Sequence, residues 1–209
     1  MIEVLLFVAT SFMIGLSGAM APGPLLTVTI SDSLKKGSKA GPLLVLGHVI
    51  GEVLLILLIL EGLGWLITSS LASAWVGLIG GAVMIFLGLN MIRDTSSGME
   101  SDGFKDFGLV SKGLVTSVSN PYFFIWWGTI GAALMLKGME LAKLTGLAAF
   151  LIGHWSSDFA WYGIVSFFSA RGKPILKSSY RFIISACGVF LIVVGLYFIL
   201  TSSITRLIA

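Results

Sequence analysis

Long apolar runs separated by short polar breaks dominate the chain. Each run is long enough for a helix of about 20 residues to cross the hydrocarbon core of a bilayer. The six runs cover residues 3–31, 41–62, 72–92, 108–136, 143–168 and 180–203. Because lipid offers the backbone no hydrogen-bond partners, spans of this length must be helical. The pattern predicts an all-α membrane protein with six transmembrane helices.

The composition agrees with this pattern. Hydrophobic residues make up 56% of the chain and charged residues only 11%, whereas soluble domains carry about 25% charged residues. The net charge of +3 does not indicate nucleic acid, because the basic residues lie in short loops. The sequence contains no Gly-rich phosphate loop, nucleophile elbow or soluble enzyme motif. We therefore expect neither an enzyme nor a cofactor. The expected partners are membrane lipid and a small-molecule substrate, and a homo-oligomer stays open.

Lysine and arginine gather in the breaks that follow the first, third and fifth runs. Ten of the 13 basic residues lie there: Lys35, Lys36, Lys39, Arg93, Lys105, Lys112, Arg171, Lys173, Lys177 and Arg181. Cytoplasmic loops carry the excess of positive charge in membrane proteins. We therefore expect these loops in the cytoplasm and both termini outside, in a multi-pass protein of the cytoplasmic membrane.

A short motif occurs twice, at an interval of about half the chain. His48 and Glu52 return as His154 and Asp158, at an offset of 106 residues. A pair of glycines also returns, at an offset of 107 residues: Gly81 and Gly88 correspond to Gly188 and Gly195. The chain is therefore predicted to contain a duplicated unit of three helices.

A unit with an odd number of helices begins its second copy from the opposite face of the membrane. We therefore predict two inverted three-helix repeats, related by a pseudo-two-fold axis in the membrane plane. Residues 1–209 would form a single transporter domain. Its first repeat covers about 1–92, a polar linker about 93–107, and its second repeat about 108–203.

The first helix of each predicted repeat contains a proline-based interruption. Helix 1 carries Pro22-Gly23-Pro24, and helix 4 carries Ser119-Asn120-Pro121. Proline removes a backbone donor and clashes with the preceding turn, and Asn followed by Pro is a favoured start for a new helix. We predict that both helices are interrupted around a cavity, where irregular backbone is tolerated. The start of a half-helix would suit a carboxylate there. The alternative is a simple proline kink in each helix.

Each copy of the repeated motif places a histidine and a carboxylate on one helix face, because they are four residues apart. A carboxylate at mid-membrane is costly unless it is protonated, paired or in contact with water. The two-fold axis could bring Glu52 and Asp158 together, and two close carboxylates do not both ionise easily. We predict these residues as coupling acids, with His48 and His154 as a relay that tunes them.

Two alternatives to this relay stay open. The acids and histidines could be structural, hydrogen-bonded groups without a role in transport. Alternatively, the two imidazoles and two carboxylates could bind a divalent ion such as Zn²⁺ or Mn²⁺. Four tryptophans also lie deep in the predicted helices: Trp126, Trp127, Trp155 and Trp161. They could line a pathway, but core packing is their expected role.

Several short motifs together resemble the LysE/RhtB family of amino-acid exporters. They are Pro22-Gly23-Pro24, Gly37 with Gly41, Gly47 with Gly51, Gly81 with Leu87-Gly88, and Asn120-Pro121. The resemblance covers the whole chain, including its length and six segments. It implies efflux of amino acids or related small metabolites from the cytoplasm against a proton gradient. It also implicates the residues of the two proline motifs, and the family commonly has an acid where Glu52 stands.

The two histidines and Asp158 depart from typical members of that family. A divalent-cation exporter is therefore the alternative, whereas the single cysteine, Cys187, excludes a thiol relay. The interpretation favoured by the sequence is a secondary-active exporter with a central site between the two helix breaks. The residues predicted for binding and coupling are Pro22, Gly23, Pro24, His48, Glu52, Ser119, Asn120, Pro121, His154 and Asp158.

Overall fold

The protein is all-helical in the part that the structure, a computed structural model, describes: residues 1–65, 69–94, 108–172 and 179–202. By length and composition, four of the helices could cross a membrane. They are α1 (Ile2–Ala19), α3 (Ala40–Leu60), α5 (Ser70–Asp94) and α9 (Tyr180–Thr201). Most of the predicted linker, residues 95–107, lies outside the described residues.

Two of the six predicted spans, 3–31 and 108–136, are divided among several helical segments. Residues 108–136 contain α6 (Leu109–Val118), α7 (Pro121–Trp126), the π-helix η1 (Trp127–Gly131) and the start of α8 (Ala132–Gly172). The long helix α8 is itself broken, because Ala142 and Lys143 have non-helical backbone angles. Its second part therefore covers the predicted fifth span, 143–168.

Both predicted interruptions are present. The chain leaves α1 at Ala19 and begins α2 (Pro24–Lys36) after Gly23, whose backbone is extended. In the other interruption, α6 ends at Val118 and α7 begins at Pro121. In both places the new helix starts on a proline, which fits the first turn because it has no N–H to donate.

The polar end of α2 corrects one prediction. The sequence predicted a break over residues 31–39, but α2 continues to Lys36 and buries Asp32 and Ser33. Both Asp32 oxygens accept hydrogen bonds from Lys112 Nζ of α6, at 3.0 and 2.8 Å. Ser33 Oγ lies 2.7 Å from Ser166 Oγ of α8. These partners replace water, which explains how polar residues remain inside a helical bundle.

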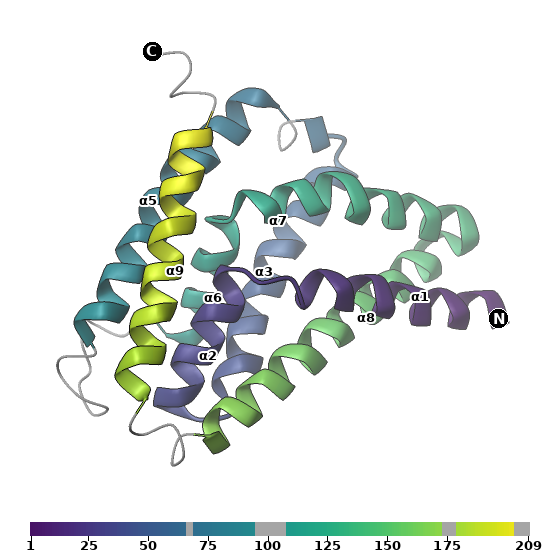
Figure 1. The fold of residues 1–209 in the computed structure, drawn as a ribbon. Coiled ribbons are helices and arrows are strands. Elements are labelled where there is room, and N and C mark those ends of the chain that lie inside the picture. Colours follow the sequence, from purple (N-terminus) through teal and green to yellow (C-terminus); the bar gives the residue numbers. More distant parts are fainter. Residues whose placement is uncertain (66–68, 95–107, 173–178, 203–209) are drawn as a thin grey trace.

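Glycines bring several helices into close contact (Figure 1). Helices α5 and α9 lie side by side, and a Cβ atom at Gly81 or Gly88 would collide with the carbonyl oxygen of Gly195 or Gly188, respectively. Helix α1 packs on α8, and α3 packs on α6. Small residues allow such close approach between membrane helices.

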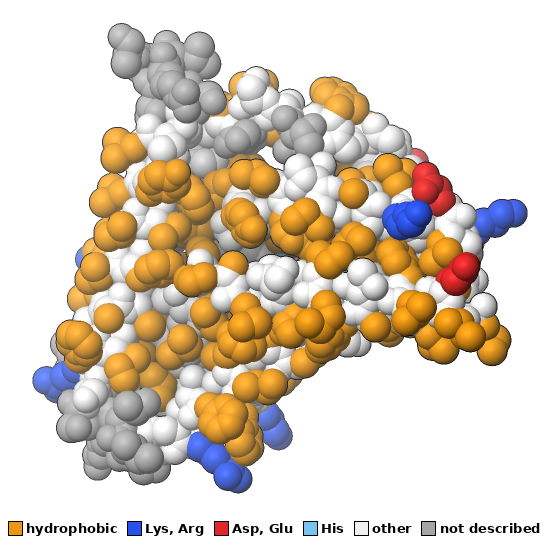
Figure 2. All heavy atoms as spheres, turned by 45° about the vertical axis from the view of Figure 1, so that its right-hand side comes forward, with side chains coloured by type: hydrophobic (Ala, Val, Ile, Leu, Met, Phe, Trp, Pro, Cys, Tyr) orange, Lys and Arg blue, Asp and Glu red, His pale blue; other side chains and the backbone are white. Residues whose placement is uncertain are grey.

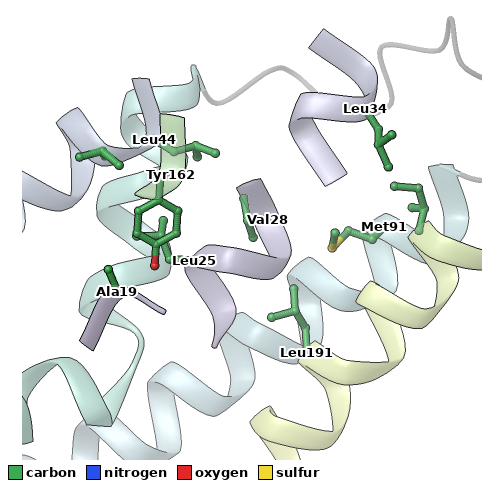
Figure 3. Packing of buried hydrophobic residues seen from close by; sticks show 10 residues of the cluster. Ala19, Leu25, Val28, Leu34, Leu44, Met91, Tyr162 and Leu191 are labelled. Carbon is green, nitrogen blue, oxygen red and sulfur yellow. The ribbon is translucent and has the colours of Figure 1, made fainter. Parts of the chain in front are cut away.

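Helix α2 lies at the centre of one hydrophobic core. Figure 3 shows Leu25, Val28 and Leu34 of α2 among side chains of the surrounding helices, with Tyr162 on one side and Leu191 on the other. The outer surface is also apolar: in Figure 2 hydrophobic side chains cover most of the visible face, and charged side chains gather at its edges. This distribution suits a protein whose outer surface contacts lipid.

Candidate functional site

A cavity of about 370 Å³ lies between the two helix interruptions. Eight of the ten predicted site residues line it: Pro22, Gly23, Pro24, His48, Glu52, Asn120, His154 and Asp158. Ser119 does not line it; its carbonyl oxygen lies against Gly80 of α5. Pro121 also lies outside the lining, at the first position of α7. The two breaks thus meet at one cavity, while the role of these residues in transport stays a prediction.

The two helix starts at the cavity differ in how they are capped. At α7, Asn120 Oδ1 accepts a hydrogen bond from the Tyr122 N–H at 3.1 Å. At α2, the cap residue Gly23 has no side chain to play this part. The first N–H groups of any helix lack an acceptor within the helix. Pro24 and Leu25, the first residues of α2, line the cavity. The positive end of the α2 helix dipole therefore lies at the cavity without a side-chain cap.

Glu52 of α3 is surrounded by nitrogen atoms. It is 1% exposed. Its Oε1 accepts a hydrogen bond from Trp127 Nε1 at 3.2 Å and lies 2.8 Å from His154 Nε2. The same oxygen lies 3.1 Å from His48 Nε2, and Oε2 accepts from Trp155 Nε1 at 2.9 Å. Both carboxylate oxygens are therefore engaged.

Asp158 of α8 has a much poorer set of partners, although the repeat makes it the counterpart of Glu52. Its side chain is buried, yet Oδ2 has no hydrogen-bond partner among the described residues. The nearest nitrogens are His154 Nε2 at 3.5 Å and His48 Nε2 at 4.0 Å. Each histidine thus lies near the acid four residues later, at 3.1 Å for His48 and Glu52 and 3.5 Å for His154 and Asp158, and the two pairs meet.

The two histidines also differ at their second nitrogen. His48 Nδ1 lies 2.7 Å from Ser117 Oγ, which donates its proton to the Gly113 carbonyl oxygen at 2.8 Å. With the hydroxyl proton placed there, His48 Nδ1 must be the donor to Ser117. His154 Nδ1 has no partner among the described residues. A Cβ atom at Gly15 would lie only 2.8 Å from it.

Aromatic rings fix the orientation of His154. Its ring stacks on Trp126 with centroids 4.7 Å apart and an interplanar angle of 18°. Phe150 stacks at 5.8 Å, and the edge of the Trp127 ring system meets it at 5.5 Å. The imidazole therefore has little freedom to turn Nε2 away from Glu52.

Sequence reasoning missed the part that tryptophans play. Trp127 and Trp155 pack in a hydrophobic core as expected, and both also donate indole N–H groups to Glu52. Trp127 opens the π-helix η1, and such wide turns are frequent at functional sites. Periodicity places a tryptophan inside the membrane but does not indicate which helix its N–H will reach.

The site also satisfies a simple geometric requirement for metal binding. His48, Glu52 and Asp158 each offer one ligand atom, and these atoms lie within 4.8 Å of one another. However, both Glu52 oxygens already accept indole N–H groups, which can only donate. A cation at Glu52 would have to displace at least one of them.

Comparison with known proteins identifies the family. Residues 16–202 match the family described as LysE type translocator. The "Chemotactic transduction protein ChpE" of Pseudomonas aeruginosa is 28% identical over 127 residues, which are 59% of this chain and 63% of that protein, so the match spans less than two thirds of ChpE. The "Putative amino acid efflux protein YcgF" of Bacillus subtilis is 23% identical over 190 residues, 88% of this chain and 91% of that protein. No solved structure matches the chain. The chain therefore belongs to the LysE-type translocator family and is a multi-pass membrane transporter, not an enzyme.

Proposed function

We propose that this protein is a secondary-active exporter of amino acids or related small metabolites, coupled to protons at Glu52 and Asp158. One observation carries the proposal. The cavity is lined by the start of α2, which has no side-chain cap, and by Asp158, whose buried Oδ2 has no hydrogen-bond partner among the described residues. A zwitterion needs such a pair: a helix start attracts its carboxylate, and an acid attracts its ammonium group. The similarity to a protein named for amino-acid efflux supports the same substrate class.

Reciprocal contacts support the proposed inverted repeats, residues 1–92 and 108–203. Gly81 faces Gly195, and the corresponding residues Gly188 and Gly88 face each other in the same way. A two-fold axis exchanges these two contacts, because the glycines are related by the 107-residue offset. A parallel repeat would not give this exchange.

A second set of contacts has the same symmetry. Gly47 of α3 lies against the backbone of α6 at Val110, and its counterpart Gly153 of α8 lies against the backbone of α1 at Val8. Helices α1 and α6 thus play equivalent parts in the two halves. In such transporters the substrate site lies between the repeats, and one half moves against the other to expose it alternately on each side.

Proton coupling follows from the buried acids. A carboxylate without a donor is stable inside the membrane when it holds a proton or a positively charged group. Substrate and proton would therefore replace each other at this pair of acids. An inward proton gradient would then drive the substrate outward.

A divalent-cation exporter is the second candidate, favoured by the close approach of His48, Glu52 and Asp158. The double variant His48→Gln with His154→Gln separates the two functions, because glutamine keeps hydrogen bonding but weakens metal ligation. We expect amino-acid transport to survive at least in part. Abolished transport together with lost Zn²⁺ or Mn²⁺ binding would favour the cation exporter instead.

Efflux from proteoliposomes tests the main proposal. The purified protein is reconstituted in vesicles loaded with labelled amino acids, and release is followed with and without a pH gradient of either direction. We expect release of at least one amino acid to accelerate when protons flow inward against it. Release that never responds to the gradient would contradict proton coupling. Release no faster than from loaded vesicles without protein would contradict amino-acid export.

A further inference from the structure

The two central acids occupy unequal environments, and this inequality indicates the substrate. We propose that Asp158, rather than Glu52, binds the substrate's ammonium group, and that the cavity selects neutral amino acids with a large apolar side chain. The inference rests on the proposed export of amino acids. It adds the orientation of the substrate in the cavity and the class of side chain that the cavity accepts.

The first argument is the availability of each acid. Glu52 faces two indole N–H groups and two imidazole nitrogens within 3.2 Å. An ammonium group at Glu52 would therefore compete with donors that are already in place. Asp158 lines the same cavity, and its buried Oδ2 has no hydrogen-bond partner among the described residues. A buried acceptor without a donor gains most from a charged N–H group supplied by a ligand.

The second argument is charge. The described residues that line the cavity include two carboxylates and two histidines but neither lysine nor arginine. An acidic amino acid would bury its second carboxylate without a cationic partner. A basic amino acid would need a second free anion beside Asp158, and Glu52 is already engaged. Burying an unpaired charge is far more costly than burying a neutral group. The lining thus disfavours both charged classes.

The third argument is the apolar part of the cavity wall. Helix α9 contributes Phe190, Val194, Tyr197 and Phe198 to the cavity lining. Their spacing places them on one face of the helix. Helix α7 adds Tyr122, Phe123 and Trp126. A cavity of about 370 Å³ with aromatic walls can enclose a leucine- or phenylalanine-sized molecule.

A substrate panel tests the side-chain class. Wild-type vesicles are loaded in turn with labelled leucine, phenylalanine, alanine, lysine, arginine and aspartate. We expect release in the order leucine and phenylalanine, then alanine, with lysine, arginine and aspartate near background. Preferred release of a charged amino acid would overturn the inference while leaving amino-acid export intact. No release of any amino acid would overturn both.

A matched pair of α9 variants tests the wall. Val194→Trp fills the cavity from a lining position. Val193→Trp adds the same bulk at the neighbouring position, which is 58% exposed on the outer surface. We expect Val194→Trp to reduce phenylalanine release about tenfold more than alanine release. Val193→Trp should leave the release of both amino acids unchanged. Equal losses for both amino acids in Val194→Trp would contradict a side-chain pocket at this wall.

A ligand without the amino group tests the role of Asp158. 4-Methylpentanoate has the leucine skeleton and carboxylate but no ammonium group. Binding to detergent-purified protein is measured by calorimetry for leucine and for this analogue, in wild type and in Asp158→Asn. We expect Asp158→Asn to weaken leucine binding about 10- to 100-fold, the range of a charge-assisted hydrogen bond, and to leave the binding of the analogue unchanged. Such non-additivity identifies a direct interaction.

The same measurement separates binding from structure. An Asp158→Asn protein that elutes and melts like wild type but loses leucine binding and 4-methylpentanoate binding by the same factor would overturn the assignment. So would unchanged leucine binding. Asp158→Glu, which keeps the charge, should retain more leucine binding than Asp158→Asn, and the reverse order would also contradict the proposal.

Discussion

At the scale of single residues, two acids that correspond in the repeat have different surroundings. Glu52 accepts hydrogen bonds from Trp127 and Trp155 and lies against both histidines, whereas Asp158 Oδ2 has no hydrogen-bond partner among the described residues. The difference arises in neighbouring side chains, not in the acids. In the proposed mechanism, Glu52 is fixed by its donors and holds the histidines in place. Asp158, whose Oδ2 accepts no hydrogen bond from the described residues, would then change its occupant.

This difference predicts unequal effects on stability. In Glu52→Gln, the new NH₂ group would point its protons at an indole N–H, and two donors would face each other. We expect a loss of about 1–3 kcal/mol, the cost of an unsatisfied buried polar group. Asp158→Asn should melt close to wild type, because Oδ2 accepts no hydrogen bond from the described residues. Thermal unfolding in detergent measures both, and a Glu52→Gln protein as stable as Asp158→Asn would contradict the role given to the tryptophans.

Gly15 provides a second test at this scale. Ser117 stands beside His48, whereas Gly15 stands beside His154 and leaves room for its ring. A methyl group at Gly15 would collide with Ser157 Oγ and lie 2.8 Å from His154 Nδ1. We expect Gly15→Ala to destabilise the protein by about 1–3 kcal/mol through overpacking and to impair transport.

Gly163→Ala is the matched control, since a Cβ atom on this α8 glycine meets nothing within 4 Å. Alanine favours a helix by about 0.5–1 kcal/mol over glycine. We therefore expect Gly163→Ala to melt at or above the wild-type temperature and to transport normally. Similar behaviour of the two variants in thermal unfolding would show that His154 does not need the space at Gly15.

At the scale of helices, the two ends of α2 have different surroundings. Its start opens on the cavity, and its last turns are held by the ion pair of Asp32 with Lys112 and by the serine contact with α8. Asp32 is buried and Lys112 is 28% exposed, so the lysine can still reach water if its partner is lost. The ion pair therefore links α2, which follows the first break, to α6, which precedes the second.

We expect Asp32→Asn to lower the stability of the protein by about 1–3 kcal/mol, because charged hydrogen bonds become neutral ones. Lys112→Met should cost more, because it leaves the buried Asp32 without a partner. The exchange Asp32→Lys with Lys112→Asp should recover part of the loss. Thermal unfolding of the three proteins measures these differences in stability. An exchange variant less stable than both single variants would mean that the ion pair alone does not explain why the acid is at position 32 and the lysine at position 112.

At the scale of the whole molecule, the sequence predicts those features that depend on local chemistry. Hydropathy indicates the helical segments, and the two proline motifs predict the interruptions, because both effects act within a few residues. The exact repeat of His48 and Glu52 as His154 and Asp158 predicts that the four side chains meet. The proposed two-fold symmetry would carry that information over a long distance in the chain.

Other features depend on pairings that no local pattern encodes. Asp32 lies in a polar stretch that reads as a loop, and only Lys112 on α6 explains its burial. Trp127 and Trp155 read as core residues until the position of Glu52 is known. The division of the fourth span among α6, α7, η1 and the start of α8 likewise depends on how α7 and η1 pack around the site.

The orientation of the molecule in the membrane is the last prediction, and it depends on charge alone. Ten of the 13 basic residues lie in the loops predicted to be cytoplasmic, and moving them across the membrane is costly. We expect Glu3 to face outside and Lys39 to face the cytoplasm; both are exposed. In a Cys187→Ala background, which removes the single cysteine, Glu3→Cys should react in intact cells with a maleimide that cannot cross membranes. Lys39→Cys should react only after the cells are opened. Labelling in the opposite order would mean that both termini are cytoplasmic, and the basic loops would then lie on the side that the positive-inside rule disfavours.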